Sequence, residues 1–259
     1  MCSPIKLRSN RKVSGEELGY LRYGFQTLID KLKLEVERSG TVILGQKVIK
    51  IDHDEQCVHG VQTERNHYRA KSVVSTISPQ LVQPLADFPA AYQARLQKNK
   101  SQSVVCALFG MKVPLIDTYW LNIRSETLPF AVIIEHTNFH DLPGYDGQKI
   151  LYVAGYQDGA HHPFYQLSEE EIIERYLQGL EQEFGLKRSN ILWHKLAKAS
   201  AVGPIYTVNF LENVLPHQTG IEGLIIGGMM TSYPERGISA SIEQGEHCAA
   251  LSLAYLEQQ

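Results

Sequence analysis

One stretch near the C-terminus has residue types and an order that suit a binding site. Residues 223–245 read GLIIGGMMTSYPERGISASIEQG, in which an apolar run ends at Gly227 and Gly228 and Gly237 precedes small residues. Paired glycines let a ligand approach the backbone, and the free N–H groups at a helix start attract anions or carbonyl oxygens. The pattern is typical of a cofactor wedged at the carboxyl end of a sheet. It is equally typical of a tight strand–turn–helix connection that needs glycine only for its backbone.

The usual companion of a nucleotide-binding segment is missing from the sequence. A dinucleotide-binding unit carries G-x-G-x-x-G between a strand and a helix, where the backbone cradles a pyrophosphate. The 259 residues contain no such run, and the nearest candidate on the N-terminal side, LRYGFQ at 21–26, has one glycine. The sequence therefore predicts part of a nucleotide-binding site without the part that holds the phosphates.

The elements that must position these residues follow from hydrophobic periodicity. Residues 25–36 repeat apolar side chains at helical spacing, and residues 41–77 contain short β-branched runs separated by turn residues. These patterns predict a helix, then a strand, a meander and a return strand. The apolar run 224–226 predicts a buried strand, and residues 238–258 predict a long terminal helix.

Two helices carry further signals. Ser168 and Glu171 form a capping-box pattern before an amphipathic run, and Gly185 follows it as a helix end. On the predicted terminal helix, small residues fall four apart and form a face on which another backbone could lie close; they are Ser241, Gly245 and Ala249. Gly245→Leu is therefore expected to lower stability whether or not a cofactor binds.

Composition excludes several classes of function. The net charge is −3 with no long basic run, which gives no support for binding nucleic acid or a membrane surface. The four cysteines are far apart, which argues against a disulfide framework or a zinc site and indicates a reducing compartment. The sequence shows no signal peptide and no apolar stretch long enough to span a membrane. We expect a soluble, cytoplasmic protein.

Five separated stretches resemble the flavin-containing amine oxidase superfamily, in particular its protoporphyrinogen-oxidase-like and phytoene-desaturase-like members. They are ELGYLRYGFQTLIDKL (17–32), TVILGQKVIKID (41–52), VHGVQTE (58–64), AKSVVSTISP (70–79) and the segment 203–251. Their order matches the family, whereas the family's N-terminal βαβ unit with its glycine fingerprint has no counterpart here.

The resemblance implies an α/β (α+β) fold. It would consist of a partial FAD-binding domain of the glutathione-reductase-like type with an inserted mixed-sheet substrate domain. The corresponding boundaries are 1–88 for the first part of the FAD-binding domain, 89–202 for the substrate domain, and 203–259 for the strand and helix that complete the FAD-binding domain.

The resemblance also implies roles for single residues. Gly24 matches the second glycine of a pair near the flavin, and Tyr23 stands in place of the first. Val48 matches the strand residue whose main chain meets the adenine edge. Gly227 and Gly228 match the segment that faces the phosphate and ribityl region of FAD. Ile238, Ser239 and Ala240 match the helix start whose N–H groups face the flavin N1/C2 carbonyl edge, and Gly237 opens this helix terminus.

Three further residues would border the flavin and the substrate. Tyr206, Tyr233 and Arg236 lie in segments that the resemblance places beside the cavity, although tyrosines in such runs also serve as core residues with their hydroxyls at the rim. No catalytic residue is nominated, because a flavin carries the redox chemistry itself. The histidines at 136, 140, 161 and 162 are interpreted as surface or loop residues, so no metal is expected.

The implied function is FAD-dependent oxidation, in which hydride passes from a C–N or C–C bond of a small organic substrate to flavin N5. Two alternatives stay open. The chain could be a non-catalytic, truncated remnant that binds no FAD. It could instead be one chain of a split enzyme, completed as a homo-oligomer or by a partner chain that supplies the missing dinucleotide-binding unit.

Overall fold

The computed structural model describes residues 19–234 and 237–259, and the chain divides into two units, Met1–Val42 and Ile43–Gln259. In the first unit the predicted helix is confirmed as α1 (Gln26–Val36). Its apolar stripe is exposed, and none of its side chains is buried. Gly24, just before the helix, has a φ of 82°, a conformation that glycine adopts without strain.

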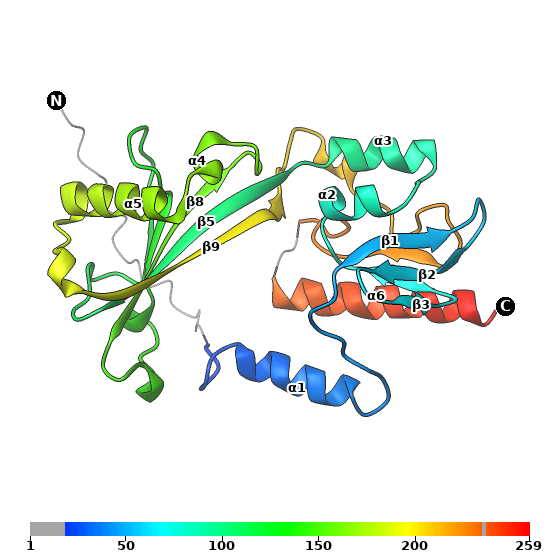
Figure 1. Cartoon of the computed structure of the whole chain (residues 1–259), viewed down its shortest axis with the longest axis horizontal. Helices are drawn as coiled ribbons and strands as arrows, with labels where there is room; N and C mark the ends of the chain where they lie inside the picture. Colours follow the sequence, from blue (N-terminus) through cyan, green and yellow to red (C-terminus); the bar gives the residue numbers. More distant parts are fainter. Residues whose placement is uncertain (1–18, 235–236) are drawn as a thin grey trace. The chain divides into compact units, whose positions relative to one another are not determined.

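The second unit begins with the predicted meander. Strands β1 (Val48–His53), β2 (Val58–Thr63) and β3 (His67–Arg69) form an antiparallel sheet in that order (Figure 1). The return strand β4 (Val73–Ser75) leaves this sheet and pairs in parallel with β10 (Leu224–Ile226). The predicted return strand and the predicted buried strand at 224–226 are therefore confirmed as strands. Their parallel pairing joins segments about 150 residues apart in the chain.

Helices cover this part of the second unit. They are α2 (Pro79–Val82), α3 (Ala90–Lys98) and the terminal helix α6 (Ile238–Leu256). A core of buried apolar side chains joins β1, β2, α2, α3 and β10 to the loop that precedes β10. Only Ala240 and Cys248 of α6 are buried.

The predicted packing face of α6 is not packed by the described residues. Ser241, Gly245 and Ala249 are exposed, and a Cβ added at Gly245 would meet nothing within 4 Å. The prediction of close packing is wrong here because α6 turns its Cys248 side toward β10 instead. A larger residue at position 245 therefore meets no described neighbour.

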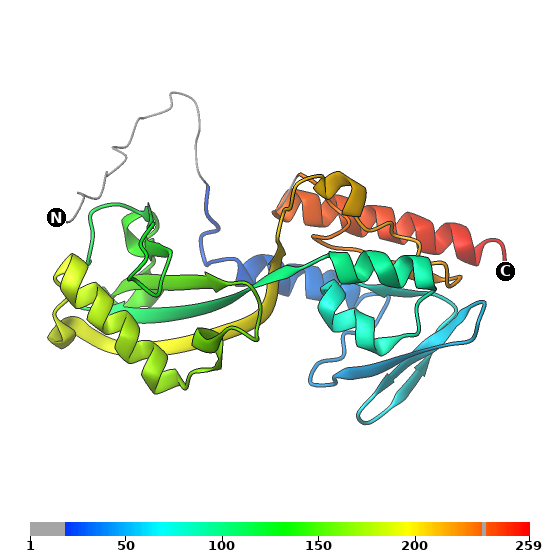
Figure 2. The ribbon, with the colours of Figure 1, turned by 90° about the horizontal axis from the view of Figure 1, so that it is seen from above.

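The rest of the second unit is a five-stranded antiparallel sheet. Its strands, in spatial order, are β6 (Trp120–Asn122), β7 (Val132–Glu135), β8 (Lys149–Gln157), β5 (Ser101–Met111) and β9 (Ile191–Pro204). Figure 2 shows α5 (Glu169–Phe184) lying along this sheet, and its apolar side chains share one core with β5, β7 and β8. The short helix α4 (Pro163–Gln166) precedes α5.

The predicted ends of α5 are confirmed. Ser168 Oγ accepts a hydrogen bond from the Glu171 N–H, Glu171 accepts one from the Ser168 N–H, and Gly185 ends the helix with a φ of 67°. Short 3₁₀ helices occupy five connections: Gln83–Leu85, His136–Asn138, Pro143–Tyr145, Arg188–Asn190 and Phe210–Asn213. None of the described helices combines the length and the apolarity needed to cross a membrane.

Candidate functional site

The parallel strands β4 and β10 end side by side. The Gly227 N–H donates to the Ser75 carbonyl at 2.9 Å, and both chains then leave the sheet. A cavity of about 280 Å³ lies there, lined by the residues that follow the two strands (76–79 and 227–230) and by the adjacent ends of β5 and β9. This is the carboxyl end of a parallel pair, the edge at which open α/β sheets bind ligands.

The two positions at this edge are occupied by glycine for different physical reasons. A Cβ at Gly227 would lie 2.5 Å from Cys248 Sγ, so glycine is required for α6 to pack against β10. Gly228 has a φ of 128°, which disfavours other residues, and a Cβ added there would lie 3.5 Å from the Thr76 carbonyl oxygen, an ordinary contact. Gly227 therefore serves the fold, whereas Gly228 also leaves the cavity accessible.

The N-terminus of α6 lies at the same edge. No side chain among the described residues caps it at Gly237, and the first N–H groups of a helix have no partner within the helix. Gly228, Gly237 and Ala240 line one small hollow together. The loop is tied to α6 because the Thr231 N–H donates to the Gly228 carbonyl at 3.1 Å and the Thr231 hydroxyl lies 2.7 Å from Gln244 Oε1.

Two of the residues predicted to bind the cofactor, Ile238 and Ser239, do not line this hollow with their side chains. Both side chains are exposed. Any contact from them to a ligand would therefore come from their backbone N–H groups. These groups lie in the first turn, where the positive end of the helix dipole favours an anionic or carbonyl edge.

One polar atom of the cavity lacks a partner. Ser78 Oγ is buried and finds no hydrogen-bond partner among the described residues, and Ser78 lines the cavity at the end of β4. A buried unpaired hydroxyl costs roughly 1–3 kcal/mol, so such groups normally meet a ligand or water. An unpaired hydroxyl, an uncapped helix start and a glycine-lined opening together fit a flat cofactor with polar ring edges.

Three aromatic rings that contact one another come from segments that also line the cavity. The centroids of Tyr206 and Tyr233 are 5.2 Å apart, and Phe210 lies 4.7 Å from Tyr206 and 5.5 Å from Tyr233. Tyr206 follows Pro204, and Tyr233 follows Met230, both of which line the cavity. The structure thus brings together the two tyrosines that sequence reasoning selected, whereas Arg236 lies outside the described residues.

Val48 lies in a second, neighbouring cavity. This space of about 710 Å³ is largely apolar and shares Thr76, Ile77 and Leu81 with the first. Gly24 belongs to the first unit, and its proposed role near the flavin stays a prediction.

The histidines that were not expected to bind a metal make local contacts. His136 Nε2 lies 3.2 Å from the Tyr145 hydroxyl. His162 Nδ1 accepts the Phe164 N–H and caps α4. His161 lies 3.7 Å from Asp158. His140 Nε2 is a buried ring nitrogen.

Sequence reasoning missed the β4 side of the cavity. Thr76 and Ser78 were part of a predicted strand and helix start, and Phe210 and Met230 were not selected at all. A usable signal existed for the first two. Once 73–75 and 224–226 are paired as parallel strands, the residues that follow each must meet at one edge.

Comparison with known proteins decides the family. The family model described as flavin containing amine oxidoreductase matches residues 1–251. The chain belongs to this family. No curated protein sequence matches the chain.

Solved structures share the fold. A provisionally assigned protoporphyrinogen oxidase from Exiguobacterium sp. 255-15 has a TM-score of 0.71 at 18% identity, with 92% of this chain and 52% of that one covered. An oxidoreductase from Methanosarcina mazei has a TM-score of 0.62 at 19% identity, covering 92% and 55%. A redesigned putrescine oxidase also reaches 0.62 at 14% identity, covering 90% and 53%. The chain spans about half the length of these neighbours.

Proposed function

We propose that this chain contributes the flavin-facing and substrate-facing part of an FAD-dependent oxidoreductase. Bound FAD would supply the redox chemistry by accepting a hydride from a C–N or C–C bond of a small organic substrate. The observation that carries the proposal is the cavity at the ends of β4 and β10, where the buried Ser78 hydroxyl has no partner among the described residues. Membership of a flavin-containing family supports the choice of cofactor.

The chain's own residues would bind and orient this cofactor. Ser78 Oγ would hydrogen-bond a polar ring edge, and the first N–H groups of α6 would stabilise negative charge on that ring. Gly228 would let the ring approach the backbone. Tyr206, Phe210 and Tyr233 would form an aromatic wall that shields the substrate from water.

We further propose that a dinucleotide-binding unit from outside these 259 residues completes the FAD site. Within the described residues the parallel sheet has two strands, whereas parallel sheets are usually covered on both faces. Val74 of β4 is 39% exposed, and Leu253 of α6 is 60% exposed. Ile49 and Leu81 line the largely apolar cavity beside β4. A strand–helix unit would pair with the open edge and cover this apolar surface.

FAD retention tests the cofactor proposal. The purified chain is incubated with excess FAD, passed over a gel-filtration column, and examined by visible absorption and by titration of flavin fluorescence. We expect measurable binding that becomes tighter when a glycine-fingerprint unit is co-expressed. A second copy acting as the partner would appear as FAD-dependent dimerisation instead. Absence of binding both with and without the added unit would refute the proposed function.

A matched pair of serine variants locates the ring. Ser78→Ala removes the unpaired hydroxyl, and we expect FAD affinity to fall about threefold to tenfold, the size of one hydrogen bond. Ser189→Ala changes an exposed serine in the 3₁₀ helix Arg188–Asn190 and should leave affinity unchanged. Equal affinities for the two variants would remove Ser78 from the cofactor site.

A further inference from the structure

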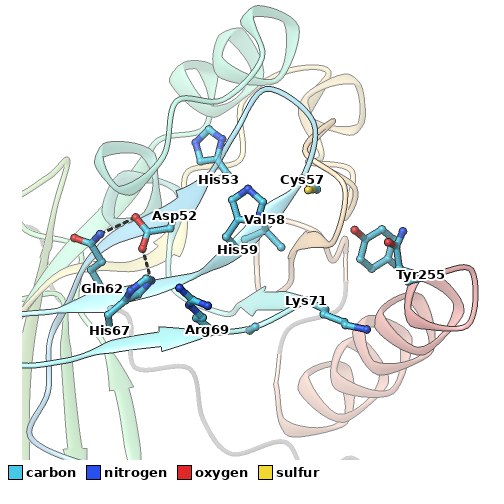
Figure 3. A pocket seen from close by; sticks show the side chains of 12 residues that line it. Asp52, His53, Cys57, Val58, His59, Gln62, His67, Arg69, Lys71 and Tyr255 are labelled. Atoms are coloured by element: carbon cyan, nitrogen blue, oxygen red, sulfur yellow. Dashed lines mark hydrogen bonds and ion pairs between the residues drawn. The ribbon is translucent and has the colours of Figure 1, made fainter.

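The hairpin between β1 and β2 gathers three different metal-binding side chains. One donor atom each from Asp54, Cys57 and His59 lies within 4.8 Å of the other two. Cys57 and His59 line a cavity of about 850 Å³, shown in Figure 3, which also reaches the C-terminal end of α6 at Tyr255. This cavity is separate from the residues that line the candidate flavin site.

Local hydrogen bonds fix the direction of these donors. Asp54 Oδ1 accepts the backbone N–H groups of Gln56 and Cys57, each at 2.8 Å. The other oxygen, Oδ2, lies 2.9 Å from His59 Nε2. Cys57 and His59 are two residues apart on an extended chain, so their side chains point to the same face. The carboxylate is therefore held by the turn with one oxygen directed at the remaining ligands.

Two other segments of the chain lie next to this cluster. Cys57 pairs with Glu222 in an isolated bridge, and Tyr255 reaches the site from α6. Burial first, then the Asp54 and Glu222 carboxylates, raise the pKa of the Cys57 thiol. Burial also contributes most to the raised pKa of the Tyr255 hydroxyl, followed by Cys57, Glu222 and Asp54. The turn N–H groups lower the pKa of Asp54 to about 2, so this group is ionised at neutral pH. A bound cation would offset the charge of the Asp54 and Glu222 carboxylates, both of which act on Cys57.

We propose that Asp54, Cys57 and His59 bind Zn²⁺ or a similar thiophilic divalent cation through Oδ2, Sγ and Nε2. This mixture of sulfur, nitrogen and oxygen donors is the set that zinc prefers, and three protein ligands leave a fourth position for water. The Cys57 thiol releases its proton to solvent as the metal–sulfur bond forms. His59 binds as the neutral imidazole with its proton on Nδ1, so two metal bonds replace the contact between Nε2 and Asp54 Oδ2. The site differs from the cysteine-pair patterns usually sought, since its D-x-x-C-x-H spacing uses a single cysteine.

Cobalt(II) substitution tests the site directly and without flavin. The whole chain is stripped with a chelator and titrated with Co²⁺, and the thiolate-to-cobalt charge-transfer band is followed in the near ultraviolet. We expect a band that saturates at one ion per chain and disappears when Zn²⁺ is added in competition. The absence of a charge-transfer band would overturn the proposal, whatever the outcome for FAD.

Variants assign the ligands. Cys57→Ser should abolish the band, and His59→Gln should weaken binding more than about tenfold, the lower end of the loss from even an outer-shell partner. Asp54→Asn keeps an oxygen to accept the turn N–H groups but removes the charge, so it should weaken binding with the hairpin intact. Cys106→Ser, at another free cysteine, is the matched control and should change nothing. A band that survives Cys57→Ser but is lost in Cys106→Ser would refute the assignment.

Discussion

The two sheet regions of the second unit differ in how completely they bury their apolar residues. In the five-stranded sheet, Phe109 and Leu151 are fully buried, and so is Tyr176 of the helix α5 that covers the sheet. In the β4–β10 region, the residues of β10 are buried, but Val74 of β4 and Leu253 of α6 are 39% and 60% exposed. The parallel sheet has two strands within the described residues. Both regions have a buried core. The helix α5 closes the core of the first, whereas the parallel pair of the second has an open edge among the described residues.

The difference in burial distinguishes residues that stabilise the fold from exposed apolar residues that a further binding partner would cover. Antiparallel sheets are stable with one face toward water, whereas parallel strands are normally covered on both faces. The exposed apolar surface around β4 and α6 is therefore best explained by a further contact, such as the dinucleotide-binding unit proposed above. Substitutions in the closed core should thus act on stability, and those on the open face should act on assembly.

The largest effect is expected in the closed core. Phe109→Ala removes a ring that is fully buried between β5 and its neighbours, and we expect unfolding free energy to fall by about 3–5 kcal/mol. Val113→Ala, at an exposed position just beyond β5, should change it by less than about 0.5 kcal/mol. Urea denaturation measures both. Similar losses for the two variants would contradict a well-packed core.

A smaller loss is expected where α6 meets β10. The Cβ of Gly227→Ala would lie 2.5 Å from Cys248 Sγ, so we expect a loss of about 1–3 kcal/mol from overpacking. Cys248→Ala removes the clashing sulfur and should recover part of this loss in the double variant. A double-mutant cycle by urea denaturation measures the coupling, and strictly additive losses would show that the two residues do not meet.

The open face of α6 should respond in the opposite direction. Gly245→Ala adds a Cβ that meets no described atom within 4 Å, and alanine favours a helix over glycine by up to about 1 kcal/mol. We therefore expect a small gain in the stability of the chain, measured by thermal unfolding. Gly245→Leu should likewise be tolerated by the chain alone but should weaken binding of an added dinucleotide-binding unit. A loss of stability with Gly245→Ala would mean that this face is already packed.

Local patterns predicted the elements of the fold well. The capping box at Ser168 and Glu171 and the end at Gly185 needed only near neighbours in sequence, and all three were confirmed. The meander was predicted for the same reason, because turn residues and β-branched runs are local. The packing face at Gly245 was predicted wrongly, because small residues at helical spacing do not show whether a neighbour is present.

The sites depend on pairings that the sequence does not reveal. Ser78 and Gly228 meet only because β4 and β10 pair across about 150 residues. Likewise, Asp54, Cys57 and His59 converge because a tight turn folds the first back over the other two, and Glu222 joins them from a distant segment. Family resemblance pointed to the edge at Gly227 and Gly228, whereas no resemblance pointed to Asp54, Cys57 and His59.

The smallest expected effect lies on the exposed side of α5. Arg188 makes two hydrogen bonds to Glu174, at 2.7 and 2.8 Å, and these bonds, with a weaker contribution from Gln178, lower the pKa of Glu174 to about 2. Because the folded pKa lies below the model-peptide value of 4.5, the contribution to stability is complete above pH 4.5. It is then lost as the pH falls toward about 2.

Arg188→Ala should therefore lower the melting temperature slightly at pH 7, and its difference from the wild type should shrink at acidic pH or in 1 M salt, since exposed ion pairs are screened (about 3 Å Debye length). Lys187→Ala, at the neighbouring exposed position, serves as the control in the same melts. A difference that persists unchanged at low pH would assign the role of Arg188 to packing of its alkyl chain. The closed region would then owe its stability at this corner to contact area and not to charge.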